Sequence, residues 1–147
     1  MNTLTIVIPA FNEAKTIHLI LDKVQKVELL NDMKKEIIVV DDCSSDDTYG
    51  ALESYISQNK IDDIQICRHE KNLGKGAALH TGISKATGDY LIIQDADLEY
   101  DPEEYNILLK PMLDGVADVV YGSRFMGGNP HRILFFWHSI GNKFLTF

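Results

Sequence analysis

The chain has 147 residues, of which 45% are apolar, so it is long enough for one domain with a sizeable buried core. Its 14 Lys and Arg against 22 Asp and Glu give a formal net charge of −8, which argues against nucleic acid as the main partner, because phosphate backbones select basic surfaces. No run of about 18 or more apolar residues occurs, so no membrane span is predicted.

Short β-branched runs alternate with segments of helical period along the chain. The first strand is predicted at Thr3–Pro9, and the helix after it by an apolar stripe of Ile17, Ile20, Leu21 and Val24. In chain order the pattern then predicts strand Glu36–Asp41, helix Asp46–Ser57, strand Ile64–Arg68, helix Lys75–Lys85, strand Tyr90–Asp95, helix Pro102–Leu113 and strand Asp118–Tyr121. This alternation predicts an α/β fold with a doubly wound, mostly parallel sheet.

Two local features refine these elements. Residues 37–40 and 91–93 are continuously apolar, as expected of strands that are covered on both faces of a parallel sheet. The N-cap of the helix at Asp46–Ser57 is expected to be Ser44, Ser45 or Asp46.

Polar residues follow each predicted strand where the strand ends. The segments concerned are Pro9–Glu13, Asp41–Asp46, His69–Gly76, Asp95–Asp97 and Gly122–Arg124. Because ligands of open α/β sheets bind outside the carboxyl ends of the strands, we expect these five loops to form one site.

The run Asp95-Ala96-Asp97 is the most informative of these loops. In an extended backbone, side chains at i and i+2 point the same way, so the two carboxylates are predicted to converge. Two hard oxygen donors suit Mg²⁺ or Mn²⁺ with room left for a phosphate ligand. Taken alone, the same run is also typical of a solvated turn.

The first two loops offer groups that could recognise a nucleotide. At least one of Asp41 and Asp42 is expected to face the cleft as a hydrogen-bond acceptor, or Asp42 instead caps the next helix. Phe11 could lie against a base or pack in the core. Glu13 could bond a ligand hydroxyl or favour the start of a helix.

Two basic residues could meet an anion. Lys75 lies at a predicted helix N-terminus, which forms either an anion site or a plain tight turn. The loop lacks the P-loop and dinucleotide glycine patterns. Arg124 could pair bidentately with phosphate or form a surface ion pair. His69, at a strand end, is a weaker site candidate.

Cys43 and Cys67 are too few and too isolated for a disulfide framework or a zinc site. They predict small thiols in a reducing compartment, and the N-terminus shows no secretory signal pattern, so a cytoplasmic location is expected.

The last segment, Arg132–Phe147, is rich in large apolar side chains. It is expected to be a core helix, an amphipathic helix at the inner face of a membrane, or a contact with another copy in a homo-oligomer. Its apolar end without a cap predicts that the native polypeptide continues.

Taken together, the loops resemble the nucleotide-diphospho-sugar transferases of glycosyltransferase family 2, with the GT-A fold. The resemblance is closest to the polyprenyl- or dolichyl-phosphate mannose and glucose synthases. It is carried by Ile8–Glu13, Val39–Thr48, Asn72–Ala78, Asp95–Asp97 and Gly122–Phe125. It covers nearly the whole chain, so residues 1–147 are expected to form the N-terminal, nucleotide-sugar-binding portion of a longer GT-A domain.

The resemblance assigns roles to particular residues. It implies that the nucleotide pocket is lined by Pro9, Phe11, Glu13, Val40 and Asp42. It implies that the metal and the donor diphosphate are held by Asp95, Ala96 and Asp97, and that the phosphate near the reacting centre is faced by Arg124. Cys43 stands where the family usually has Gly, so a differently shaped turn is expected here.

The predicted function is metal-assisted, inverting transfer of a hexose from a UDP- or GDP-sugar, with Asp97 and Arg124 as catalytic residues. Polyprenyl phosphate is the expected acceptor, since its oxygen is already ionised and needs no general base; a glycan acceptor would need one. Such an enzyme would serve cell-envelope or glycan biosynthesis. The alternatives are a non-catalytic nucleotide-sugar-binding fragment and a sugar nucleotidyltransferase, although the latter would carry a Gly-rich basic loop after the first strand.

Overall fold

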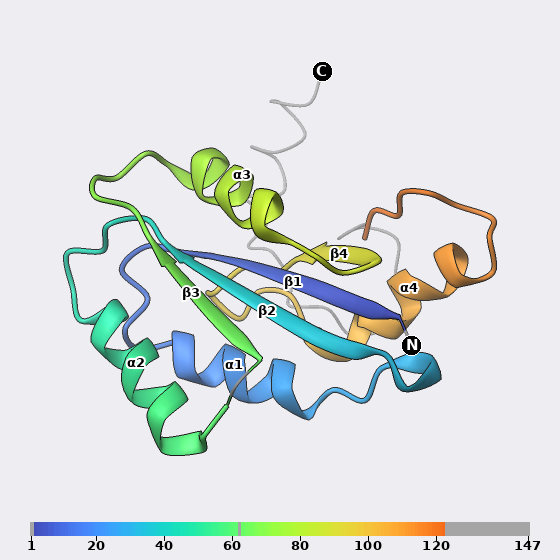
Figure 1. Cartoon of the computed structure of the whole chain (residues 1–147), viewed down its shortest axis with the longest axis horizontal. Helices are drawn as coiled ribbons and strands as arrows, with labels where there is room; N and C mark the ends of the chain where they lie inside the picture. The colour runs from blue at the N-terminus through green and yellow to red at the C-terminus, as the bar shows by residue number, and fades with distance from the viewer. Residues whose placement is uncertain (1, 62, 123–147) are drawn as a thin grey trace, which may run out of the picture. The chain divides into compact units, whose positions relative to one another are not determined.

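The strand β1 (Thr3–Ala10) lies inside a four-stranded parallel sheet with the order β3-β2-β1-β4. Its neighbours are β2 (Lys34–Asp41) and β4 (Tyr90–Ile93), and β3 (Ile64–Arg68) pairs with the far side of β2. The computed structural model describes residues 2–61 and 63–122 (Figure 1). The chain divides into two compact units, residues 1–107 and 108–147. The predicted α/β class and parallel sheet are confirmed.

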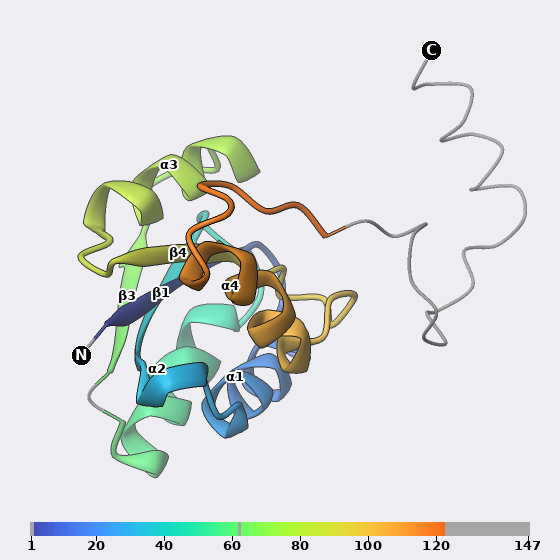
Figure 2. The same cartoon turned by 90° about the vertical axis from the view of Figure 1, so that its right-hand side faces the viewer.

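Helices cover both faces of this sheet. The helix α3 (Lys75–Lys85) packs on β1 and β2 from one side, and α1 (Ile17–Lys26) and α2 (Thr48–Asn59) lie against the other face (Figures 1 and 2). The buried face of α1 consists of Ile17, Ile20, Leu21 and Val24, as the apolar stripe predicted. The remaining elements are the short 3₁₀ turns η1 (Leu30–Asp32) and η2 (Pro102–Glu104), and α4 (Tyr105–Leu113).

The helix α3 approaches the sheet closely at Gly82. A Cβ atom at this position would lie 2.3 Å from Cγ1 of Val7 in β1 and 3.4 Å from Cγ2 of Val40 in β2. Only a residue without a side chain fits that gap. Gly82 therefore sets the distance between α3 and the sheet, and with it the height of the α3 N-terminus above the strand ends.

Two of the predicted strands differ from the structure. Asp118–Tyr121 has no strand conformation in the described part of the chain, and Val119 and Tyr121 are exposed. An apolar β-branched run becomes a strand only where another strand supplies hydrogen bonds. The fourth strand ends at Ile93, two residues before the predicted Asp95, because the chain turns at residues 96 and 97.

Two further predictions were wrong in detail. Leu91 and Ile93 are exposed rather than covered on both faces, because β4 is an edge strand and α3 packs on β1 and β2. The N-cap of α2 is Asp47, which makes no side-chain cap bond; instead the backbone N–H of Thr48 donates to Oδ1 of Asp46 at 3.0 Å. Among the described residues, no helix is long and apolar enough to cross a membrane.

Candidate nucleotide-sugar site

A cavity of about 430 Å³ opens at the carboxyl edge of the sheet. The loops after all four strands contribute to it, as expected for an open α/β sheet. Its lining residues are Pro9, Ala10, Phe11, Glu13, Asp42, Asn72, Gly74, Lys75, Ala78, Asp95, Ala96 and Asp97.

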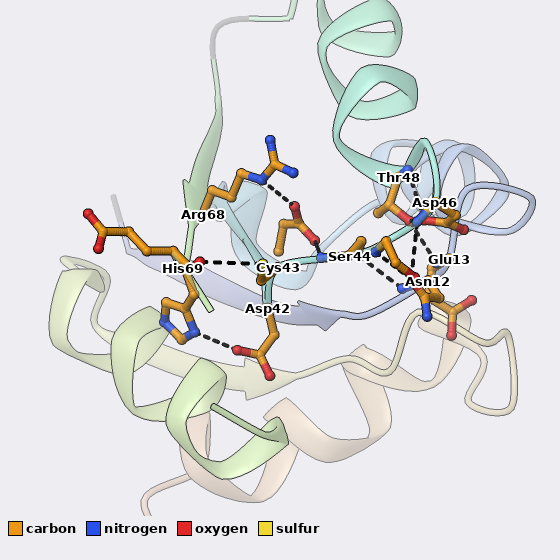
Figure 3. Close-up of polar contacts among 12 residues, drawn as sticks. Asn12, Glu13, Asp42, Cys43, Ser44, Asp46, Thr48, Arg68 and His69 are labelled. Atoms are coloured by element: carbon orange, nitrogen blue, oxygen red, sulfur yellow. Dashed lines mark hydrogen bonds and ion pairs between the residues drawn. The ribbon is translucent and has the colours of Figure 1, made fainter. Parts of the chain in front are cut away.

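The loops after β1 and β2 are fastened to each other by Asn12. Its side-chain carbonyl accepts hydrogen bonds from the backbone N–H of Ser45 at 2.8 Å and of Asp46 at 3.3 Å (Figure 3). The backbone N–H of Glu13 donates to the Thr48 hydroxyl at 2.8 Å. These bonds hold the backbone that follows Phe11, a residue that is 46% exposed and lines the cavity. A flat apolar surface is therefore available to a ligand.

The carboxylate of Asp42 is buried and hydrogen-bonded by the following loop. Oδ1 accepts from the backbone N–H of Leu73 at 2.9 Å and lies 2.6 Å from Nδ1 of His69, while Oδ2 accepts from the N–H of Gly74 at 2.7 Å (Figure 3). Burial by itself raises the pKa of Asp42, but these hydrogen bonds outweigh it and leave the pKa below its usual value. Two oxygens offer about four acceptor positions, so about one remains for a ligand.

Asp41 points elsewhere. Its Oδ1 accepts from the N–H of Ser44 at 3.0 Å, and its Oδ2 lies 3.1 Å from Nε of Arg68. The Arg68 guanidinium in turn lies 4.7 Å from the centre of the Tyr49 ring. Asp41 is fully buried and does not line the cavity, so it supports the turn, and Asp42 is the carboxylate of this pair that lines the cavity.

Cys43 takes the left-handed conformation, which glycine adopts most readily. Its φ is +58°, and its thiol contacts the carbonyl of Glu70 at 3.6 Å. The turn therefore keeps a glycine-like backbone in spite of the substitution, at the expense of some strain.

The loop after β4 rests on the buried side chain of Gln94. The Gln94 amide donates to the carbonyls of Asp95 at 3.0 Å and Tyr100 at 3.2 Å, and its oxygen accepts from the Tyr105 hydroxyl at 2.7 Å. Burial raises the pKa of Tyr105, so this hydroxyl stays protonated and able to donate. The hydrogen bonds of Gln94 thus hold the loop that carries Asp95 and Asp97 in place.

Asp95 and Asp97 line the same cavity, but not by the predicted extended geometry. The strand ends before them, Asp97 lies in a turn, and its Oδ1 accepts from the N–H of Glu99 at 3.0 Å. Asp95 forms an ion pair with Lys75, whose Nζ lies 2.6 Å from Oδ1. Within the described part of the chain, no group of three or more His, Cys, Asp or Glu side chains could hold a metal. Two carboxylates without a third protein ligand fit Mg²⁺ or Mn²⁺ that is also bound by substrate phosphates.

Most of the predicted site residues therefore lie around one cavity: Pro9, Phe11, Glu13, Asp42, Lys75, Asp95, Ala96 and Asp97. Val40 does not, because its fully buried side chain packs with Ile38 and Ala78 behind the cavity wall. Arg124 and Arg132–Phe147 lie outside the described residues. Sequence reasoning missed the roles of Asn72 and Gln94, although Asn72 stands in the motif Asn72–Ala78.

The comparisons with known proteins agree with this fold. Residues 5–139 match the family described as glycosyl transferase family 2. The chain belongs to this family. It is 29% identical over 124 residues to the dolichol-phosphate mannosyltransferase of Pyrococcus furiosus, a match that covers 84% of this chain and 34% of that protein.

Two solved structures resemble the chain. A mannosyltransferase from Pyrobaculum calidifontis in complex with GDP-Man and Mn²⁺ matches with a TM-score of 0.59 and 32% identity, over 64% of this chain and 27% of that one. The S. aureus protein TarS, residues 1–349 in complex with UDP-GlcNAc, matches with a TM-score of 0.63 and 26% identity, over 77% and 31%. The chain spans between about a third and about half the length of the curated relatives it matches.

Proposed function

We propose that the protein transfers a hexose from a UDP- or GDP-sugar to a polyprenyl phosphate, with inversion and with the help of Mg²⁺ or Mn²⁺. The observation that carries this proposal is that one cavity gathers Asp42, Lys75, Asp95 and Asp97 from three separate loops. These residues supply a hydrogen-bond acceptor, a positively charged side chain and a pair of carboxylates. A nucleoside diphosphate bound with a divalent metal needs these three kinds of group.

The nucleoside end of the donor is assigned to the loops after β1 and β2. The ring of Phe11 offers a face for the base, and the remaining acceptor position of Asp42 takes an N–H donor of the base. Uracil and guanine both present such a donor. Glu13 lines the same cavity and is assigned to a ribose hydroxyl.

The diphosphate end is assigned to Asp95, Ala96, Asp97 and Lys75. Asp95 and Asp97 would hold the divalent cation, and the bound cation would offset the negative charge that develops on the departing diphosphate. The small side chain of Ala96 leaves space between the two carboxylates, and Lys75 brings a positive charge to the phosphates. The family motif assigns Arg124 to the stabilisation of the negative charge that develops on the departing diphosphate. Arg124 and Asp97 are the proposed catalytic residues.

Polyprenyl phosphate is proposed as the acceptor because it is ionised near neutral pH and can attack without a general base. The similarity to a dolichol-phosphate mannosyltransferase supports this choice. A cytoplasmic protein that meets its lipid acceptor through residues 132–147 at the membrane surface would fit this activity.

The binding half of the proposal is tested with Asp97→Ala. We expect titration calorimetry to detect UDP or GDP with Mn²⁺ in the parent protein and to lose that heat in D97A. Glu28→Ala is the matched control, because Glu28 is an exposed carboxylate outside the cavity. Equal binding by the parent and D97A would overturn the metal assignment.

The transfer half is tested by nucleotide release from UDP- and GDP-sugars with and without polyprenyl phosphate. Release that needs the lipid phosphate supports the synthase. Release without any acceptor contradicts it, and binding without release favours the second candidate, a non-catalytic donor-binding fragment.

A further inference from the structure

The ion pair between Lys75 and Asp95 lies where the proposed cation would bind. The ammonium nitrogen is 2.6 Å from Oδ1 of Asp95, which is a direct charge-assisted hydrogen bond. The Asp95 side chain is 18% exposed and that of Lys75 is 59% exposed. The largely buried Asp95 carboxylate thus binds the ammonium group at the end of the long, largely solvated Lys75 side chain.

The position of Lys75 in α3 is unfavourable for a cation that has no anionic partner. It is the first residue of the helix, where the aligned peptide dipoles place a partial positive charge. In this structure the Asp95 carboxylate compensates for this. A bound diphosphate would compensate equally well, because helix N-termini attract phosphate.

The surroundings of Lys75 leave its side chain room to move. Its two neighbours are Gly74 and Gly76, and a Cβ atom built on either would meet nothing within 4 Å. Both Lys75 and Gly74 line the cavity. Because the Lys75 side chain is itself 59% exposed, its ammonium group can leave Asp95 for another anion in the same cavity without a change of the backbone.

A divalent cation and the Lys75 ammonium cannot share Oδ1 of Asp95, because two positive charges about 4 Å apart repel each other strongly where water is partly excluded. We propose that Lys75 is a placeholder cation: it occupies Asp95 while the site is empty, and it moves to the donor diphosphate when the divalent cation takes Asp95. This inference rests on the proposed function. It makes Lys75 a residue that couples the binding of the metal to the binding of the donor.

A purely structural ion pair leads to the opposite expectation. If Lys75 only orients Asp95 for the metal, removing its charge leaves the carboxylate less ordered and weakens metal binding. If Lys75 competes with the metal, removing its charge strengthens the binding of the metal alone. The sign of the change in metal affinity therefore separates the two explanations.

The test compares Lys75→Met, which keeps the length of the side chain, with Lys75→Arg, which keeps its charge. Mn²⁺ binding is measured by the paramagnetic resonance signal of free Mn²⁺, and UDP and GDP binding by calorimetry at saturating Mn²⁺. We expect K75M to bind Mn²⁺ alone about two- to fivefold more tightly. We expect it to bind the nucleotide about tenfold more weakly, because a charge-assisted bond to phosphate is lost.

The matched controls are K75R and Lys85→Met. K75R keeps the positive charge beside Asp95 and should not show the tighter binding of Mn²⁺ alone that is expected of K75M. Lys85 is at the other end of α3, about 15 Å along the helix, so K85M makes the same change in net charge away from the site and should alter neither affinity. Circular dichroism checks that every variant is folded, and Lys75→Gln serves as a second neutral variant.

The inference is overturned if both neutral variants bind Mn²⁺ alone as weakly as the parent or more weakly. It is also overturned if the nucleotide tightens Mn²⁺ binding by the same factor in K75M as in the parent. The proposed function fails in a different way, namely if the parent protein binds neither Mn²⁺ nor a nucleoside diphosphate, or binds them equally well after D97A. The two failures are therefore distinguishable.

Discussion

His69 lies between two elements of the site, with Nδ1 2.6 Å from Oδ1 of Asp42 (Figure 3) and Nε2 2.9 Å from the Thr81 hydroxyl. Asp42 begins the loop that follows β2, His69 follows β3, and Thr81 belongs to α3. One imidazole ring thus connects the proposed base pocket to the helix whose first residue is Lys75. Sequence reasoning ranked His69 only as a weak candidate, because its two partners are 27 residues before it and 12 residues after it.

His69→Ala is expected to weaken UDP or GDP binding about five- to tenfold, because Asp42 loses a hydrogen-bond partner and its carboxylate becomes less fixed. His69→Asn keeps a donor near the position of Nδ1 and should recover most of the affinity. His80→Ala, an exposed histidine of α3, is the control. Calorimetric titration checks all three, and equal affinities for H69A and the parent would remove His69 from the site.

The contribution of Asp42 to stability is expected to depend on pH. Its pKa is lowered in the folded state, so its stabilising effect is fully present above the unfolded pKa of about 3.9 and is lost as the pH falls through the lower, folded pKa. Asp42→Asn should therefore lower the free energy of unfolding by about 1–3 kcal/mol at pH 7. Urea unfolding between pH 7 and pH 3 should show this difference shrinking below about pH 4. A difference that stays constant over this range would contradict the lowered pKa.

Tyr105→Phe tests the support beneath the Asp95–Asp97 loop. Loss of the hydroxyl leaves the buried oxygen of Gln94 without its partner, which should cost about 1–3 kcal/mol of unfolding free energy. The loosened loop should also bind Mn²⁺ less tightly. Tyr55→Phe is the matched control, because its hydroxyl bonds Asp22 at 2.9 Å between α2 and α1, so its loss should affect stability but not Mn²⁺ binding. A similar effect of both variants on Mn²⁺ would refute the support role.

The Cys43→Gly variant is expected to have a free energy of unfolding about 1 kcal/mol higher than that of the Cys43→Ala variant. Both variants remove the thiol, but only glycine removes the Cβ atom that makes a φ of +58° unfavourable. The same pair at Cys67, in the strand β3, should show the reverse order, because glycine weakens a strand interior. The denaturant midpoints of the four variants measure these differences in stability. Equal stability of C43G and C43A would show that the backbone of the turn relaxes in C43A.

Two glycines of α3 should respond to alanine with opposite signs. Gly82→Ala places a Cβ atom 2.3 Å from Val7 and should destabilise the protein by about 1–3 kcal/mol. Gly76→Ala meets open space and should stabilise it by about 0.5–1 kcal/mol, the usual helix preference for alanine. Thermal unfolding of both variants measures the difference. If G82A were as stable as the parent, the close approach of α3 to β1 would be wrong.

The strands β1 to β4 and the helix α3 could be predicted to within about two residues, because local period and composition are enough to identify them. The gathering of polar loops at one edge followed from the parallel sheet. The strand predicted at Asp118–Tyr121 was wrong, because a strand needs a neighbouring strand as its hydrogen-bond partner, and the local sequence does not show whether one is present.

The sequence by itself determined which side chains stand at the ends of the strands, and so which chemistry is available there. Only the tertiary structure decided which of those side chains are already engaged: Asp42 with His69, Leu73 and Gly74, and Asp95 with Lys75. It also decided that Val40 lies behind the cavity wall rather than in it. The reason is that a strand's period tells only which face a residue occupies, whereas its partners come from segments 20 to 32 residues away in the chain.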